Sequence, residues 1–168
     1  QKKYKEAQQS YLLMISLPLC LPDSITPEQF LTEYWQKKPL LIKQGLPQLI
    51  GMFEPDDMLG LALEEDASAR LLTQAALKQD GQPQWQLKKS PLIEADFDNL
   101  PEQWTVLVQN VDQWSPELGQ LWQAFDFIPQ WQRDDIMVSY APKGGSVGKH
   151  YDDYDVFLAQ GYGQRRWQ

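Results

Sequence analysis

The sequence predicts an α+β fold in which helices and a small sheet come first and an antiparallel barrel or sandwich follows. Two observations carry this expectation. Residues 26–125 alternate amphipathic, helix-like segments with short β-rich runs. From Asp135 onward, helical periodicity disappears and strand-like segments are separated by glycines.

The first predicted helix begins at a capping motif. Thr26 offers a capping hydroxyl, Pro27 suits the first helical position, and Gln29 stands where a capping box needs an amide. This helix must end before Pro39, because proline disfavours helical geometry in the residue ahead of it. Residues 1–22 contain an apolar stretch interrupted by prolines, and we expect an irregular lead-in or extension there rather than a secretory signal.

The next elements follow from local composition and spacing. Amphipathic spacing predicts two further helices, over residues 56–65 and 116–125, the second with its apolar side chains inward (Leu118, Leu121, Trp122 and Phe125). Apolar and β-branched runs predict strands at 39–43, 70–74, 85–88 and 104–111. The two middle strands form a hairpin around an Asp80–Gly81 turn, and Gly45 closes the first strand. Later strand-like segments cover 136–141, 143–149, 150–160 and 161–168.

Composition and charge narrow the class of protein. With 168 residues, 42% of them hydrophobic, the chain is long enough for a globular domain with a buried core. A net charge of −8 argues against direct nucleic-acid binding and suits a cationic partner, although acidity also simply favours solubility. The single cysteine, Cys20, cannot form an internal disulfide, which indicates a cytoplasmic protein. No stretch has the roughly 20 apolar residues that would cross a membrane.

The strongest chemical pattern is the pair His150 and Asp152, which follows the glycine-rich loop of residues 143–149. Residues two apart on a strand share a face, so both side chains project together, and Tyr154 shares that face. An imidazole and a carboxylate supply two corners of the 2-His-1-carboxylate triad that holds Fe(II). The loop glycines would let the backbone pass close to a ligand.

A structural interpretation of the same histidine stays open at this point. A lone strand histidine is commonly a packed, hydrogen-bonded core residue, and His-x-Asp arises by chance in many proteins. Other acidic groups crowd this histidine (Tyr151, Asp153 and Asp155), and burying them without a cation would be costly. From spacing alone, the metal site and the packed core residue remain alternatives.

Two longer motifs carry a family resemblance. The first motif is FLTEYWQKKPLLIK (residues 30–43), and the second is DDIMVSYAPKGGSVGKHYDDYDVFLAQGYGQRRW (residues 134–167). In this order they closely resemble the motifs of the JmjC-type ribosomal oxygenases, bacterial arginine hydroxylases of a large-subunit ribosomal protein in particular. The resemblance covers residues 23–168. It implies N-terminal helices and a small sheet leading into an incomplete double-stranded β-helix, the cupin or JmjC barrel.

The resemblance also implies a site and a reaction. His150 and Asp152 would bind Fe(II), and Arg165 would hold the distal carboxylate of the cosubstrate 2-oxoglutarate, a task that suits a planar guanidinium. With O₂, such an enzyme hydroxylates an arginine side chain of a large-subunit ribosomal protein. The resemblance further implies a homodimer for the full-length protein.

Some features depart from the family pattern. The family's second ligating histidine lies on a later strand, and this sequence contains no other histidine, so we expect the chain alone to be inactive and the domain of residues 23–168 to be truncated before the distal metal-ligand strand. Lys149 places a cation where a smaller residue would be expected. A non-catalytic protein-binding module and a non-oxygenase metal-binding cupin are therefore the alternatives.

Overall fold

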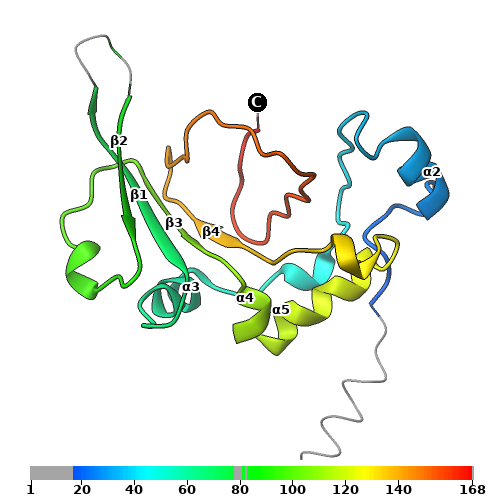
Figure 1. Cartoon of the computed structure of the whole chain (residues 1–168), viewed down its shortest axis with the longest axis horizontal. Coiled ribbons are helices and arrows are strands. Elements are labelled where there is room, and N and C mark those ends of the chain that lie inside the picture. Colours follow the sequence, from blue (N-terminus) through cyan, green and yellow to red (C-terminus); the bar gives the residue numbers. More distant parts are fainter. Residues whose placement is uncertain (1–16, 78–80, 82, 168) are drawn as a thin grey trace, which may run out of the picture. The chain divides into compact units, whose positions relative to one another are not determined.

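The computed structural model describes residues 17–77, 81 and 83–167, and these form two compact units (Figure 1). Unit 1 contains residues 17–47 and 119–134, and unit 2 contains residues 48–118 and 135–167. The expected lead-in over residues 1–22 lies largely outside the described residues, as does Asp80 of the hairpin turn. Among the helices that are described, none is long and apolar enough to cross a membrane.

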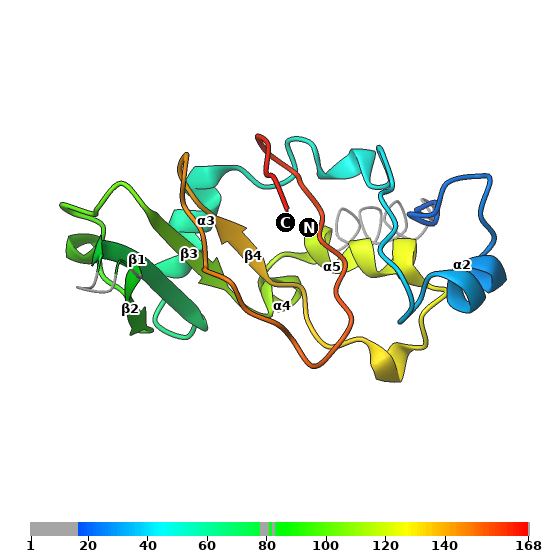
Figure 2. The same ribbon diagram turned by 90° about the horizontal axis from the view of Figure 1, so that it is seen from above.

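A four-stranded antiparallel sheet forms the centre of unit 2, in the order β2-β1-β3-β4 (Figures 1 and 2). Its strands are β1 (Ala69–Leu77), β2 (Pro83–Lys89), β3 (Trp104–Val108) and β4 (Val138–Tyr140). The predicted hairpin is confirmed, because β1 pairs with β2 over almost the whole length of both strands. The predicted α+β fold class is likewise confirmed.

The core of unit 2 lies against the central strand β3. Thr105, Val106 and Val108 are fully buried, as expected for a strand with neighbours on both sides. Helix α3 (Pro55–Ala62) packs against β3 and β4 and buries Met58 and Ala62. The helix predicted over residues 56–65 is therefore confirmed in position, although it ends three residues earlier.

The strand predicted over residues 104–111 is shorter than expected because Asn110 adopts a left-handed backbone conformation (φ 55°, ψ 34°) and caps helix α4 (Val111–Trp114). Hydrogen bonds hold this junction to the segment leading into β4. The Asn110 N–H donates to the Asp135 carboxylate at 2.9 Å, and the Val111 N–H donates to the Ile136 carbonyl at 2.9 Å. Short 3₁₀ turns, η1 (Pro47–Leu49) and η2 (Glu94–Asp96), occur elsewhere.

Unit 1 begins with helix α2 (Pro27–Glu33), which starts at the predicted capping box. The Gln29 N–H donates to the Thr26 hydroxyl at 3.1 Å, and the Thr26 N–H donates to the Gln29 side-chain oxygen at 2.9 Å. The helix buries Phe30 against Phe127, with ring centroids 5.3 Å apart. It ends before Pro39, as predicted.

Two further predictions need correction. Residues 39–43 form no strand, because no described strand pairs with them, and Leu41 is 82% exposed. Gly45 instead fits closely against the Cys20 carbonyl, where an added Cβ would lie 2.8 Å from the oxygen. The helix predicted over residues 116–125 changes from α-helical α5 (Pro116–Gln120) to the 3₁₀ helix η3 (Leu121–Phe125), followed by η4 (Gln130–Gln132).

The strand-like segments after β4 were also predicted wrongly in their local structure. The segment at 136–141 contains β4, but the described residues of 143–149, 150–160 and 161–168 form no strand and run as an irregular ribbon (Figures 1 and 2). A strand needs a neighbour to accept and donate its backbone hydrogen bonds. No described segment pairs with these residues, so their alternating pattern does not produce a strand here.

Candidate metal site

The structure brings His150 and Asp152 together. The His150 Nε2 lies 3.8 Å from the Asp152 Oδ2, and the two side chains are 51% and 38% exposed. The two residues approach each other from an irregular segment and not from the strand that the sequence predicted.

A backbone hydrogen bond orients the imidazole. The His150 Nδ1 lies 3.0 Å from the Gly148 carbonyl oxygen. Because a carbonyl only accepts, this contact places the ring proton on Nδ1 and leaves the Nε2 lone pair on the side of Asp152. Histidines that bind metals generally donate their other ring N–H in this way, which fixes the tautomer and the ring orientation.

The glycine-rich loop that carries this carbonyl is tied to the buried sheet. The hydroxyl of Thr105, a fully buried residue of β3, donates to the Ser146 carbonyl at 3.1 Å. The Ser146 hydroxyl in turn accepts from the Gly148 N–H at 3.0 Å. A continuous path of hydrogen bonds therefore runs from the core strand to His150.

The loop glycines are needed for packing against the protein itself. An added Cβ at Gly145 would lie 2.4 Å from the Trp104 carbonyl oxygen. Gly148 has a φ of +80°, and its added Cβ would lie 3.1 Å from the Trp85 indole on β2. The sequence predicted close approach to a ligand, whereas the structure shows close approach to two strands of the sheet.

Sequence reasoning therefore missed Thr105 and Trp85. Thr105 lies 41 residues before its partner Ser146, and neither residue forms part of a local motif around His150. Their contribution depends on strand pairing that brings distant segments together.

The donor atoms of the pair fit a divalent transition metal. Metal bonds to imidazole nitrogen and carboxylate oxygen are each about 2.1 Å long. The separation of 3.8 Å is less than the sum of two such bonds, so one ion can contact both atoms. One imidazole and one carboxylate are two parts of the facial triad that Fe(II) uses. Within the described ranges, no group of three or more His, Cys, Asp or Glu side chains could hold a metal.

The other residues predicted near the pair are more exposed than expected. Tyr154, which the sequence placed on the face of the metal pair, is 68% exposed. The neighbouring acidic groups are exposed, not buried as the sequence predicted, so they require no cation (Tyr151, Asp153 and Asp155). Lys149 is exposed as well.

Arg165, predicted to hold the cosubstrate, is partly buried. Its guanidinium carbon lies 5.5 Å from the centroid of the Trp167 ring, a distance at which a cation and an indole attract each other. Among the described residues, no hydrogen bond or ion pair joins Arg165 to His150 or Asp152. Its role toward 2-oxoglutarate stays a prediction.

Comparisons with known proteins agree with the motifs. Residues 120–168 match the family model of the JmjC domain. The chain is 65% identical over 153 residues to a probable ribosomal oxygenase of Haemophilus influenzae, covering 91% of this chain and 37% of that protein. It is 40% identical over 140 residues to the ribosomal protein uL16 3-hydroxylase of Escherichia coli, covering 83% of this chain and 35% of that protein. The chain thus spans about a third of the length of these relatives.

Solved structures give the same result for the fold. The ribosomal oxygenase YcfD of Escherichia coli superposes with a TM-score of 0.67 at 34% identity, over 82% of this chain and 35% of that chain. Its complex with cobalt and 2-oxoglutarate superposes with a TM-score of 0.63 at 35% identity, over 74% of this chain and 33% of that chain. The predicted relation to the N-terminal part of a JmjC or cupin fold is confirmed.

Proposed function

We propose that the protein containing this chain is an Fe(II)- and 2-oxoglutarate-dependent hydroxylase of a large-subunit ribosomal protein. The chain belongs to the JmjC-domain ribosomal oxygenases and spans about a third of their length. The observation that carries the proposal is the oriented pair of His150 and Asp152. Both residues lie within the part that matches the JmjC domain, and the Gly148 carbonyl sets the imidazole for metal binding.

In this proposal His150 Nε2 and the Asp152 carboxylate hold Fe(II). The metal, when bound, supplies the activation of O₂ that oxidises a substrate C–H bond with 2-oxoglutarate as cosubstrate. The carboxylate of Asp152 offsets part of the charge of the cation, and the Gly148 carbonyl keeps the proton on Nδ1 so that Nε2 stays free to donate its lone pair. The solved cobalt and 2-oxoglutarate complex of the Escherichia coli relative supports a metal and this cosubstrate.

Arg165 is the proposed partner of the distal carboxylate of 2-oxoglutarate. Its planar guanidinium can donate two parallel hydrogen bonds to a carboxylate, which lysine cannot do. Trp167 supports this role, since an indole beside a guanidinium restricts its motion and leaves its N–H groups available for an anion.

The proposed substrate protein is uL16, which the name of the Escherichia coli relative gives, and the proposed target in it is an arginine side chain, which the motif resemblance implies. Ribosomal proteins need lysine and arginine to contact RNA phosphates, and a chain of net charge −8 suits such a basic partner. A cytoplasmic location and a homodimer belong to the same proposal.

The test uses the full-length protein with Fe(II), 2-oxoglutarate and uL16. We expect one added oxygen on an arginine of uL16 by mass spectrometry, together with one succinate per modified residue. His150→Ala and Asp152→Ala should each abolish both signals, because each removes a metal ligand. Asp153→Ala is the matched control, since this neighbouring carboxylate is exposed and should leave turnover unchanged.

Three other results would change the assignment. Turnover that survives in either ligand variant would reject the metal site. Succinate formation without modification of any arginine would support the oxygenase chemistry and reject the proposed substrate. Absence of metal binding in the full-length protein would favour the non-catalytic protein-binding module.

A further inference from the structure

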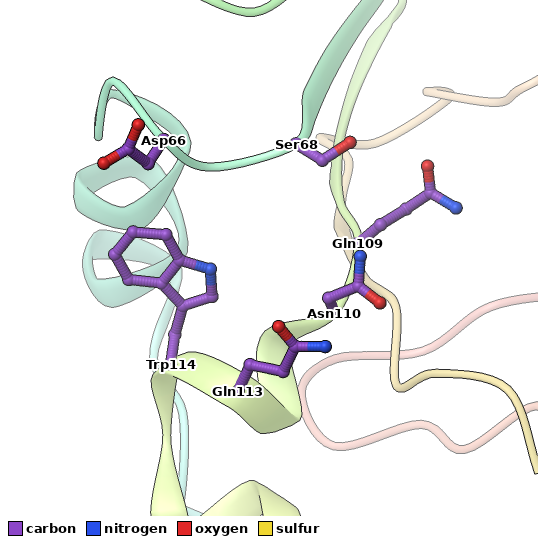
Figure 3. Close-up of a pocket in the computed structure, with 6 residues that line it drawn as sticks. All are labelled: Asp66, Ser68, Gln109, Asn110, Gln113 and Trp114. Atoms are coloured by element: carbon purple, nitrogen blue, oxygen red, sulfur yellow. The ribbon is translucent and has the colours of Figure 1, made fainter.

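A hollow of about 350 Å³ lies on unit 2, between the loop that follows α3 and the helix α4 (Figure 3). Figure 3 shows Asp66 and the Trp114 indole on one side of it and polar side chains along the other, namely Ser68, Gln109, Asn110 and Gln113. This volume is at the lower end of the range of about 300–1,000 Å³ that ligand pockets occupy. It suits a single side chain better than a large cofactor.

The side chains that line this hollow are unpaired among the described residues. Within the part of the chain that the structure describes, none of the six side chains makes a hydrogen bond or an ion pair. Their acceptors are one carboxylate, one hydroxyl and three amide oxygens. Trp114 is 42% exposed, so its indole face is open to contact.

The chain segments that line this hollow contain acids and no bases. It is lined by residues of two stretches of unit 2, 48–69 and 90–118, and neither stretch contains a lysine, an arginine or a histidine, whereas both contain several acids. The nearest base along the chain is Arg70, whose guanidinium donates to the Met137 sulfur at 3.4 Å. No positive charge of these stretches therefore competes with a cationic ligand.

From this combination we propose that the hollow binds an arginine side chain of a basic partner protein. A guanidinium can stack on the indole of Trp114, pair with the carboxylate of Asp66 and donate its other N–H groups to amide oxygens. The inference rests on the proposed function and deepens it, since a ribosomal protein is such a partner. The hollow would hold the substrate protein through residues other than the metal pair.

The test measures the affinity of the full-length, metal-free protein for a fluorescein-labelled peptide of alternating arginine and glycine, by fluorescence anisotropy. Asp66→Asn and Trp114→Leu should each weaken binding by about threefold to tenfold, the range for a cation–π contact or a partly exposed charge pair. Trp114→Phe should retain most of the affinity because it keeps an aromatic face. A peptide with glutamine in place of arginine should not bind.

Glu65→Gln is the matched control. It removes one negative charge from the same exposed loop, but Glu65 does not line the hollow. We expect a change of less than about twofold, because salt screens a charge that makes no direct contact. An equal loss in Glu65→Gln and Asp66→Asn would overturn the proposal, and so would unchanged affinity in Trp114→Leu. Thermal melting of each variant verifies that the fold is intact.

The peptide assay and the hydroxylation assay separate the two proposals. Peptide binding through Asp66 and Trp114 without modification of uL16 would support the hollow and reject the substrate. Modification of uL16 combined with unchanged peptide affinity in both variants would support the proposed function and reject the hollow. A wild-type protein that binds no arginine peptide would also reject it.

Discussion

Gly148→Ala is the substitution that most directly tests how the fold positions the candidate metal site. Gly148 contributes three features at one residue. Its carbonyl orients His150, its N–H donates to the Ser146 hydroxyl, and its α-carbon lies against the Trp85 indole with a φ of +80°. An added methyl group should therefore displace the carbonyl from the imidazole.

The magnitude follows from two contributions. A non-glycine residue in a left-handed conformation costs about 1–2 kcal/mol. The methyl group would also lie 3.1 Å from the indole, and overpacking of this kind costs about 1–3 kcal/mol. The free energy of unfolding should thus fall by about 2–5 kcal/mol. Metal affinity should fall by about 10–100-fold, the usual effect of losing an outer-shell partner of a ligand histidine.

Gly144→Ala is the control that isolates the contact with Trp85. Gly144 has a φ of +85°, and its added Cβ would meet only the Gln103 side chain, at 3.8 Å. The backbone cost is therefore the same, about 1–2 kcal/mol, while the steric contribution is absent. Chemical denaturation and metal titration of the full-length protein measure both quantities for the two variants.

Equal destabilisation by Gly148→Ala and Gly144→Ala would refute the role of Trp85, and unchanged metal affinity in Gly148→Ala would refute the role of the carbonyl. A double variant gives a further check. Trp85→Leu combined with Gly148→Ala should recover part of the metal affinity, because the smaller side chain leaves room for the methyl group.

Three other variants test separate parts of the structure. Thr105→Val removes the hydroxyl that holds the glycine-rich loop and should cost about 1 kcal/mol of stability and weaken metal binding, whereas Thr73→Val on β1 should do neither. Arg165→Lys should raise the KM for 2-oxoglutarate about tenfold or more, and Arg166→Lys should leave it unchanged. Burial raises the pKa of the Cys20 thiol from 9.0 to about 11, so the folded state retains the proton that the unfolded state loses. The contribution of this thiol to the free energy of unfolding is present below pH 9 and should decline by about 2–3 kcal/mol as the pH rises toward 11. Denaturation measured at several pH values should show this decline in the wild-type protein and not in Cys20→Ala.

The elements that could be predicted from the sequence depend on signals within a few residues. The capping box of Thr26 and Gln29 fixes the start of α2, and both hydrogen bonds occur as expected. The hairpin of β1 and β2 follows from two β-rich runs around a short connection. Such signals need no knowledge of the rest of the fold, which explains why these elements were predicted correctly.

The elements that were predicted wrongly depend on distant partners. Residues 39–43 and 150–160 have the composition of strands, but a strand forms only where a neighbour satisfies its backbone groups. Composition reports the preference of a segment and says nothing about the presence of that neighbour. The contributions of Trp85 and Thr105 were missed for the same reason, since only pairing within the sheet brings them to the glycine-rich loop.

The convergence of His150 and Asp152 has a different physical cause from the one that the sequence suggested. Strand alternation would set the two residues roughly 6.5–7 Å apart along the backbone on one face. In the structure, the imidazole instead bonds back to the Gly148 carbonyl, and its other nitrogen comes within 3.8 Å of the Asp152 carboxylate. The orientation of the pair therefore depends on a loop conformation that Thr105 and Trp85 stabilise. It follows that substitutions on β2 and β3 should alter metal affinity even though neither strand contributes a metal ligand.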